Sequence, residues 1–188
     1  MKKNHIAPPS EQGSPAETGE KKRSAKPRRR HVIRSAAAVI IIAAALAVLL
    51  SSLFLPVIQV SGSSMEPALH DGDIIVLWRS KHYDAGQLCC ISWQNKLLIK
   101  RDIAKGGETV EMDDSGNVYI NGTLLDEPYL TEKSLGECDI TFPFTVPQNR
   151  LFMLGDNRES SIDSRSSVIG CVTDEQIIGR VLFRAWPL

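Results

Sequence analysis

An uncharged apolar segment of 21 residues, from Ser35 to Leu55, constrains this chain of 188 residues more than any other feature. An α-helix of that length spans the hydrocarbon thickness of a bilayer. The segment has no polar stripe of the kind that the water-facing side of a soluble protein's helix carries. The sequence therefore predicts a single transmembrane helix over residues 35–55.

Two other interpretations of this segment are open. A cleaved secretory signal has a shorter apolar core that ends at a small-residue site. Ala45-Leu46-Ala47 has the right residue types, but apolar residues continue past it to Leu55. The length favours a permanent anchor over a cleaved signal, and the missing polar stripe favours it over a buried helix of a soluble protein.

Charge is distributed unevenly about the apolar segment, although the chain is formally neutral. Residues 1–34 hold ten Lys or Arg and three Asp or Glu, a net charge of +7, and the remainder carries −7. Lys and Arg favour the cytoplasmic flank of a membrane helix. We therefore predict that residues 1–34, where large apolar side chains are scarce, form a disordered basic cytoplasmic tail, and that residues 56–188 lie outside the cell.

Beyond Pro56 the apolar runs are strand-length and rich in branched residues. These runs are Gly72–Leu77, Leu88–Trp93, Leu97–Ile103, Thr109–Met112, Val118–Ile120, Leu151–Leu154 and Ile177–Phe183. Asp113–Asn117 and Asn121-Gly122 supply turns, because Gly and Asn tolerate the positive φ that hairpins need. The predicted fold class is mainly β, with one antiparallel β-sheet domain over residues 56–188 after the single N-terminal transmembrane helix.

Ser64 and Lys100 are the first candidates for chemistry. Ser64 lies between Gly62 and Pro67, in a segment that must turn sharply and can present a hydroxyl beside a backbone N–H. Lys100 ends the run Leu97-Leu98-Ile99-Lys100, and apolar surroundings lower the pKa of an amine, so that a lysine can be the base that activates a serine. The alternatives are an ordinary loop serine and a solvated lysine at a strand end.

The segment from Gly155 to Arg165 concentrates charged and hydroxyl side chains more densely than a simple surface loop does. A loop of this composition can orient a catalytic base. The alternative is a network of pairs that only supports a turn.

Three motifs follow the apolar segment: Gly-Ser-Ser-Met-Glu-Pro at 62–67, Ile-Lys-Arg at 99–101 and Gly-Asp-Asn-Arg-x-x-Ser-x-Asp-Ser-Arg at 155–165. Their order and spacing resemble the signature of bacterial type I signal peptidases (leader peptidases) of the Ser/Lys kind, in its Gram-positive form. The resemblance implies a membrane-bound serine endopeptidase that cleaves N-terminal signal peptides from secreted preproteins. In this chain Ser64 matches the nucleophile and Lys100 the general base.

The same resemblance implies roles for further residues. Ser161 matches the hydroxyl that orients the lysine, and Asp163 and Arg165 match a supporting ion pair, with Arg101 in the same network. The oxyanion hole would use the backbone N–H of Ser64, and a second donor stays open because Gly62 stands where some relatives have a serine.

Substrates of the family present small residues at positions −1 and −3 in an extended strand. Six residues of this chain would line the shallow pockets that receive them: Ile58, Val60, Ile75, Cys90, Leu98 and Ile99. A role in the core is the alternative for each of them.

The chain also departs from the family pattern. After Ile-Lys-Arg the family usually has a Gly-x-Pro-Gly-Asp turn, whereas residues 102–108 lack the proline. The cysteines Cys89, Cys90, Cys138 and Cys171 permit three full disulfide connectivities, and the choice stays open. No Cys-x-x-Cys motif or Cys/His cluster would hold a metal, so we expect neither a metal nor a cofactor.

Two other functions remain open. A self-cleaving SOS-type repressor uses a similar Ser/Lys dyad, but it needs a DNA-binding domain where this chain has a tail and an apolar segment. A non-enzymatic anchored module is disfavoured because Ser64 and Lys100 are both present. The expected partners are secretory preproteins and the lipid bilayer, and no nucleic acid is expected.

Overall fold

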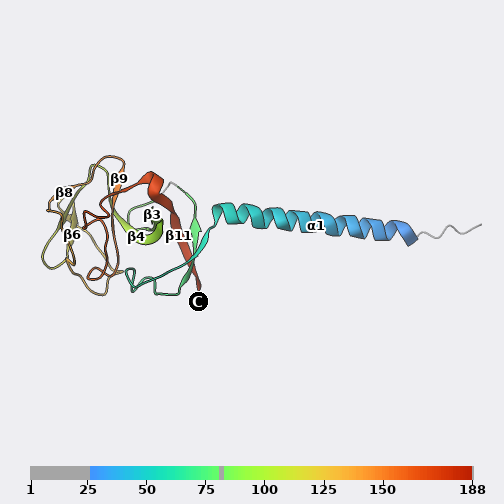
Figure 1. Ribbon diagram of the computed structural model, residues 1–188, viewed down its shortest axis with the longest axis horizontal. Helices are drawn as coiled ribbons and strands as arrows, with labels where there is room; N and C mark the ends of the chain where they lie inside the picture. The colour runs from blue at the N-terminus through green and yellow to red at the C-terminus, as the bar shows by residue number, and fades with distance from the viewer. Residues whose placement is uncertain (1–25, 81–82, 188) are drawn as a thin grey trace, which may run out of the picture. The chain divides into compact units, whose positions relative to one another are not determined.

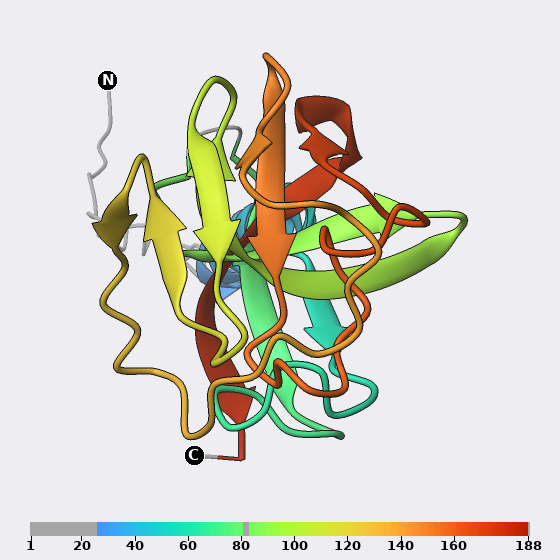
Figure 2. The same ribbon diagram turned by 90° about the vertical axis from the view of Figure 1, so that its left-hand side faces the viewer.

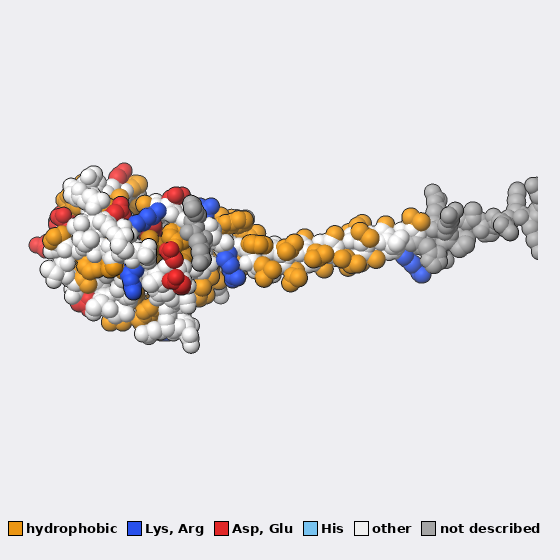
Figure 3. Space-filling view, turned by 90° about the horizontal axis from the view of Figure 1, so that it is seen from above, with side chains coloured by type: hydrophobic (Ala, Val, Ile, Leu, Met, Phe, Trp, Pro, Cys, Tyr) orange, Lys and Arg blue, Asp and Glu red, His pale blue; other side chains and the backbone are white. Residues whose placement is uncertain are grey.

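The computed structural model describes residues 26–80 and 83–187. Its α-helix, α1 (Lys26–Phe54), has 29 residues, and Val32–Phe54 within it are long and apolar enough to cross a membrane. Apolar side chains cover the visible face of α1 in Figure 3, and those described are exposed. The single apolar helix of the predicted fold class is thus present in the described chain.

The helix begins earlier than the sequence indicated. Residues 26–34, which we assigned to a disordered tail, are helical, and residues 1–25 lie outside the described residues. Pro27 is the second residue of α1, where the missing N–H costs nothing because the first turn has no partner for it. The charged residues that follow it are good helix formers, and they extend the helix past the apolar segment.

Two antiparallel sheets form the part of the chain that follows α1 (Figures 1 and 2). The larger has seven strands in the order β1-β2-β11-β3-β4-β9-β10. Their bounds are β1 (Val57–Gln59), β2 (Ile74–Trp78), β3 (Leu88–Trp93), β4 (Lys96–Lys105), β9 (Arg150–Leu154), β10 (Val172–Thr173) and β11 (Ile177–Trp186). A 3-10 turn, η1 (Asp174–Gln176), leads into β11.

The smaller sheet has the order β7-β6-β5-β8. Its strands are β5 (Thr109–Met112), β6 (Val118–Ile120), β7 (Thr123–Leu124) and β8 (Phe144–Thr145). Asn121 and Gly122 join β6 to β7 with φ of 52° and 78°, and the Asp113 carboxylate accepts backbone N–H bonds from Ser115 and Asn117. Both predicted turns therefore form with the backbone conformation that Gly and Asn permit.

Each of the seven predicted runs contains a strand, and the mainly β fold class is confirmed. The strands β1, β7, β8 and β10 were missed because two or three residues are too short to show a period, whereas the equally short β6 was predicted between its two turn signals. Successive residues of β3 point to opposite faces of the large sheet, so Cys89 and Cys90 lie in two different core clusters. All four cysteines of the chain are free thiols.

The turn after β4 forms without the family's proline. Gly107 adopts a φ of 91°, and the N–H of Glu108 donates to the carbonyl of Lys105 at 3.0 Å. The Glu108 carboxylate closes the turn by accepting the Lys105 N–H at 2.6 Å. A Cβ on Gly106 would stand 2.8 Å from the Asn149 backbone nitrogen, so the glycine also permits close chain packing.

Candidate active site

Ser64 stands at the start of a tight turn between β1 and β2. The base of this loop is closed by bonds between Val60 and the 72–73 segment, at 2.7 and 3.0 Å. Met65 is only 2% exposed and fixes the turn in the core, whereas Ser64 itself stays half-buried. The core thus holds the backbone of the turn and leaves the Ser64 hydroxyl accessible from solvent. In the described chain, neither that hydroxyl nor the Ser64 N–H has a hydrogen-bond partner.

Lys100 is the first buried residue of β4 and directly precedes Arg101, where the strand begins to pair with β9. It is 3% exposed, and its Nζ donates a hydrogen bond of 2.8 Å to the Oγ of Ser161. Burial lowers the pKa of Lys100 to about 8; the Arg165 charge acts in the same direction, while Asp163 and Asp156 oppose it. A neutral amine is therefore accessible near neutral pH.

The loop after β9 contacts both Ser64 and Lys100. The Asn157 N–H donates to the Ser64 carbonyl at 3.1 Å, and the Ser161 N–H donates to the Asn157 carbonyl at 3.0 Å. A Cβ on Gly155 would lie 2.6 Å from the Ser64 carbonyl oxygen and 2.1 Å from the Oγ of Ser161. Ser64 and the hydroxyl that binds Lys100 therefore press against one glycine.

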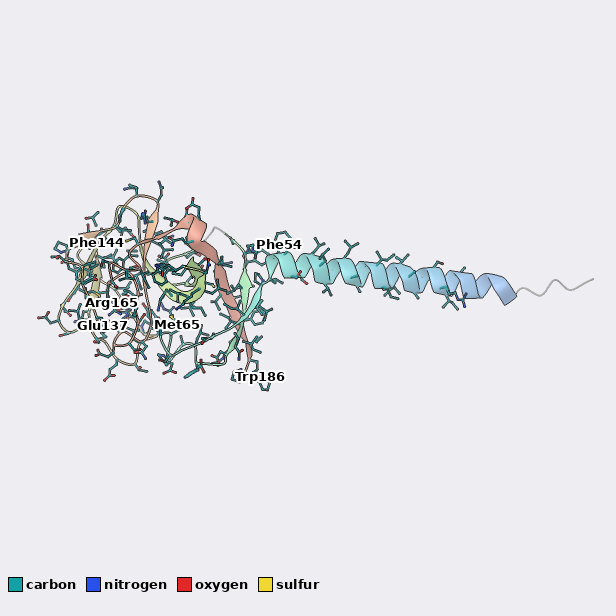
Figure 4. The ribbon with its side chains drawn as sticks, viewed as in Figure 1. Phe54, Met65, Glu137, Phe144, Arg165 and Trp186 are labelled. Carbon is teal, nitrogen blue, oxygen red and sulfur yellow. The ribbon has the colours of Figure 1, made fainter. Side chains whose placement is uncertain are left out.

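Asp163 and Arg165 form a buried ion pair that holds this loop, in the place where the resemblance predicted one. The guanidinium donates from two nitrogens to the Asp163 carboxylate, each at 2.8 Å. The carboxylate also accepts the Gly155 N–H at 2.9 Å, and Arg165 reaches the carbonyl of Ser161 at 3.2 Å. The pair thus positions Gly155, which contacts Ser64, and Ser161, which binds Lys100. Figure 4 labels Arg165 within the β domain.

Arg101, which the resemblance put in the same network, pairs with another carboxylate of the 155–165 loop. It donates to both carboxylate oxygens of Asp156, at 2.8 and 2.5 Å, and to the Gly86 carbonyl at 2.6 Å. Its guanidinium also stacks on the Tyr129 ring, 3.8 Å from the centroid. Arg101 points to the opposite face of β4 from Lys100, so no bond among the described residues links it to the Asp163–Arg165 pair.

Sequence reasoning assigned no role to Arg158 or Glu127. Both side chains are fully buried and form an ion pair, and Arg158 also donates to the Gly155 carbonyl at 3.1 Å. Arg158 stands inside the Gly-Asp-Asn-Arg motif, which was a signal for it. Glu127 lies in a stretch without a motif, and only the fold shows that it neutralises this arginine.

A shallow apolar groove adjoins Ser64, with a volume of about 100 Å³. It is lined by Ile58, Gln59, Val60, Ser61, Gly62, Ser64, Met65, Leu97, Leu98 and Ile99. Four of the six predicted pocket residues, Ile58, Val60, Leu98 and Ile99, are among them. Ile75 and Cys90 are not, because each is fully buried in the core cluster that contains Val60.

Within residues 26–80 and 83–187, no group of three His, Cys, Asp or Glu side chains is placed to hold a metal ion. The catalytic candidates are instead a serine, a lysine and backbone donors. A serine presented by a tight turn beside a buried lysine of lowered pKa is the arrangement of a serine hydrolase in which a lysine takes the proton.

Comparison with known proteins agrees with this class. Residues 33–186 match the family described as "Signal peptidase, peptidase S26". "Signal peptidase I" of Bacillus amyloliquefaciens is 37% identical over 153 residues, which cover 75% of this chain and 81% of that protein. "Signal peptidase I T" of Bacillus subtilis strain 168 is 35% identical over 148 residues, covering 72% of this chain and 75% of that protein.

A solved structure is also similar, a signal peptidase I from Enterococcus faecalis V583 with 30% sequence identity. The match covers 54% of this chain and 97% of that one, with a TM-score of 0.44. The family match and the Bacillus relatives show that the chain belongs to the signal peptidase family, peptidase S26, in its Gram-positive-like form. It is a serine endopeptidase with an N-terminal apolar helix that fits a membrane anchor.

Proposed function

We propose that this enzyme cleaves signal peptides from secreted preproteins with Ser64 as nucleophile and Lys100 as general base. The observation that carries the proposal is the buried Lys100, bonded to a loop that also binds the Ser64 carbonyl. Neutral Lys100 takes the hydroxyl proton as Ser64 Oγ attacks the scissile carbonyl, and the Ser64 N–H stabilises the oxyanion. The protonated lysine then gives its proton to the leaving amine, and as a base again it activates the water that hydrolyses the acyl-enzyme.

Ser161, Asp163 and Arg165 act as positioning residues in this proposal. Ser161 accepts a hydrogen bond from Lys100 and thereby directs the amine, and the Asp163–Arg165 pair fixes the backbone at Gly155 and at Ser161. Arg101 belongs to the same support through Asp156, which neighbours Asn157 and adds negative charge near Lys100.

The dyad is tested by three substitutions measured on one preprotein. Ser64→Ala and Lys100→Ala should each lower the cleavage rate by more than about a thousandfold, because nucleophile and base act as a unit. Ser63→Ala should be tolerated, because the exposed Ser63 is not the residue whose carbonyl the catalytic loop holds. Full activity of a folded Ser64→Ala protein would refute the mechanism.

The groove beside Ser64 fits the small residues expected at positions −1 and −3. It is apolar and holds about 100 Å³, so methyl groups enter it more easily than larger side chains. The β4 residues 97–99 have no partner on their second edge within the described chain, since pairing with β9 starts at Arg101. An extended substrate can bond to that edge. Replacing Ala by Leu at −1 or −3 should block cleavage, and unchanged rates would contradict this placement.

The bilayer is the second proposed partner. Beyond α1, the three neighbouring strands β1, β2 and β11 at one end of the large sheet expose Val57, Trp78, Phe183 and Trp186 by 40–62%. Trp and Phe at a surface suit the interface between water and lipid. Figure 4 labels Trp186 near the chain terminus, at the end of β11.

The orientation and the three segments of the chain are also proposals. Arg28, Arg29, Arg30 and Arg34 flank the apolar segment on its N-terminal side, which supports a cytoplasmic tail and an outer domain of residues 56–188. A protease added to intact protoplasts should degrade the outer domain and spare the tail. Degradation of the tail alone would reverse the topology.

A further inference from the structure

A second hollow is lined by the residues that follow Met65 in the Ser64 turn, whereas the apolar groove is lined by those up to Met65. Its volume is about 520 Å³. Its walls are the end of the Ser64 turn and two loops: Glu66, Pro67 and His70; Thr131, Glu132, Lys133 and Ser134; and Asp156, Asn157, Arg158 and Glu159. None of these residues lines the apolar groove, which ends at Ser64 and Met65.

The hollow is built on the residues that support the active site. Three buried arginines hold the segment of residues 127–135, which contains the wall residues 131–134. Arg101 stacks on Tyr129, Arg158 pairs with Glu127, and Arg165 donates to the Leu135 carbonyl at 2.6 Å. Two of these arginines also pair with Asp156 and Asp163 of the catalytic loop. The wall is therefore pre-formed and does not depend on substrate for its shape.

The substrate chain continues past the scissile bond, and this continuation is the candidate occupant of the hollow. A peptide whose scissile carbonyl meets Ser64 Oγ, with its −1 and −3 residues in the apolar groove, must leave the nucleophile on the other side. Glu66 and Pro67 are the next residues of the Ser64 turn, and the Asn157 N–H binds the Ser64 carbonyl at 3.1 Å. The hollow that these residues line is thus where the chain after the cut emerges.

Charge gives this hollow a preference. The Glu66, Glu132 and Glu159 carboxylates make no ion pair within the described residues, and Glu159 accepts the Ser134 hydroxyl. The charges of Asp156 and Arg158 are already neutralised by buried partners. Lys133 is the opposing cation, and its amine donates to Asn117 at 3.0 Å. The balance of accessible charge is negative.

We propose that this hollow binds the first residues of the mature protein, after the cleavage site, and selects lysine or arginine over aspartate or glutamate there. The proposal rests on the proposed function, since it assigns the leaving side of the same substrate. The groove selects by size on one side of Ser64, and the hollow selects by charge on the other.

The test uses full-length enzyme and preproteins with one Ala-x-Ala site that carry Lys, Ala or Glu at each of positions +2, +3 and +4. For at least one position, wild type should cleave the Lys substrate about 3- to 10-fold faster in kcat/KM than the Glu substrate, and the ratio should shrink in high salt. The enzyme Glu132→Gln/Glu159→Gln should lose the ratio. Glu111→Gln, an exposed change on β5 outside the hollow, is the matched control and should keep the ratio.

Glu132→Gln alone guards against a structural effect, because the Glu132 side chain is exposed and makes no bond within the described chain. It should reduce the Lys-to-Glu ratio without changing the rate on the Ala substrate. Equal rates for all three residues at every position, or an unchanged ratio in the double variant, would overturn the inference and leave the peptidase function standing. No Ser64-dependent cleavage of the Ala substrate would instead contradict the proposed function.

Discussion

Burial of one amine decides the chemistry available to this chain at the scale of single residues. Lys100 is 3% exposed, and its pKa falls to about 8 because desolvation disfavours the charged form. Asp163 and Asp156 limit the fall, and Ser161 holds the amine by a hydrogen bond. At pH 7 about a tenth of such lysines are neutral.

The rate should therefore depend on pH with a known sign. Only the neutral amine accepts a proton, so kcat/KM should rise through pH 8 and level off above it. Asp163→Asn removes the largest charge that raises this pKa, so the midpoint should move to lower pH. A profile that is flat from pH 6 to pH 10 would exclude Lys100 as the base.

Asp102 is buried without a hydrogen-bond partner in the described chain. It is 0% exposed, and burial raises its pKa to about 7, although the Lys105 charge opposes the rise. Because the folded pKa exceeds the ordinary value of 3.8, the penalty is absent in acid, grows as pH rises and is complete above pH 7. Such a shift corresponds to up to about 4 kcal/mol.

Asp102→Asn should therefore stabilise the protein more at pH 8 than at pH 5. The amide keeps the shape of the carboxyl group and carries no charge that burial would oppose. Thermal unfolding of both proteins at the two pH values measures this. A variant with lower stability than wild type at pH 8 would mean that Asp102 has a partner in solution.

At the scale of elements, the loop of residues 155–165 joins strands that are far apart in sequence. Its Asn157 N–H binds the Ser64 carbonyl, and its Ser161 hydroxyl binds the Lys100 amine. Its Arg158 and Arg165 side chains bind Glu127 and the Leu135 carbonyl, which flank a wall of the hollow. Gly155 permits these contacts, because Ser64 and Ser161 occupy the space of a side chain there. The loop is therefore the element that assembles the site.

Gly155→Ala should remove most activity and destabilise the domain by about 1–3 kcal/mol, since a methyl group would displace backbone on one side and the Lys100-binding hydroxyl on the other. Gly122→Ala is the comparison: its φ is +78°, but open space surrounds it on the small sheet. Gly122→Ala should cost about 1 kcal/mol through backbone strain and leave kcat/KM unchanged. Equal activity of the two variants would show that the loop tolerates movement.

At the scale of the whole molecule, the β domain contains its own cores and the helix contributes an apolar exterior. Three clusters of buried side chains lie among the strands, and none includes a residue of α1. The described large apolar side chains of α1 are 51–68% exposed. A contiguous apolar surface of this length is unfavourable in water and suits a lipid environment. The helix thus fits a membrane anchor, and the β domain contains all the candidate catalytic groups.

A fragment of residues 56–188 should therefore fold and cleave a short soluble peptide at the full-length rate. On a preprotein inserted in vesicles it should be about a hundredfold slower, because it loses the effective concentration that a shared membrane provides.

Replacing both Trp78 and Trp186 by Ser should weaken binding of this fragment to vesicles without changing peptide cleavage. Equal rates of fragment and full-length enzyme on the inserted preprotein would remove the role assigned to the anchor.

The sequence alone determined the properties that depend on neighbours along the chain. The apolar segment before Pro56, the strand runs and the turn at Asn121-Gly122 follow from local composition and period, which few residues suffice to define. The family motifs marked Ser64, Lys100 and the 155–165 loop for the same reason. The strands β1, β7, β8 and β10 were missed because two or three residues alone carry no period. The start of α1 at Lys26 was missed because the high charge of residues 26–34 indicated a disordered tail.

Only the tertiary structure decided the properties that depend on distant residues. The partner of Arg101 proved to be Asp156, Glu127 was found to neutralise Arg158, and Cys90 and Ile75 lie in the core instead of lining the groove. The lowered pKa of Lys100 also required the fold, because it is set by burial and by the charges of Asp163, Arg165 and Asp156, which are distant in sequence. Burial and ion pairing are sums over residues that meet only in the folded chain, and no local pattern records them.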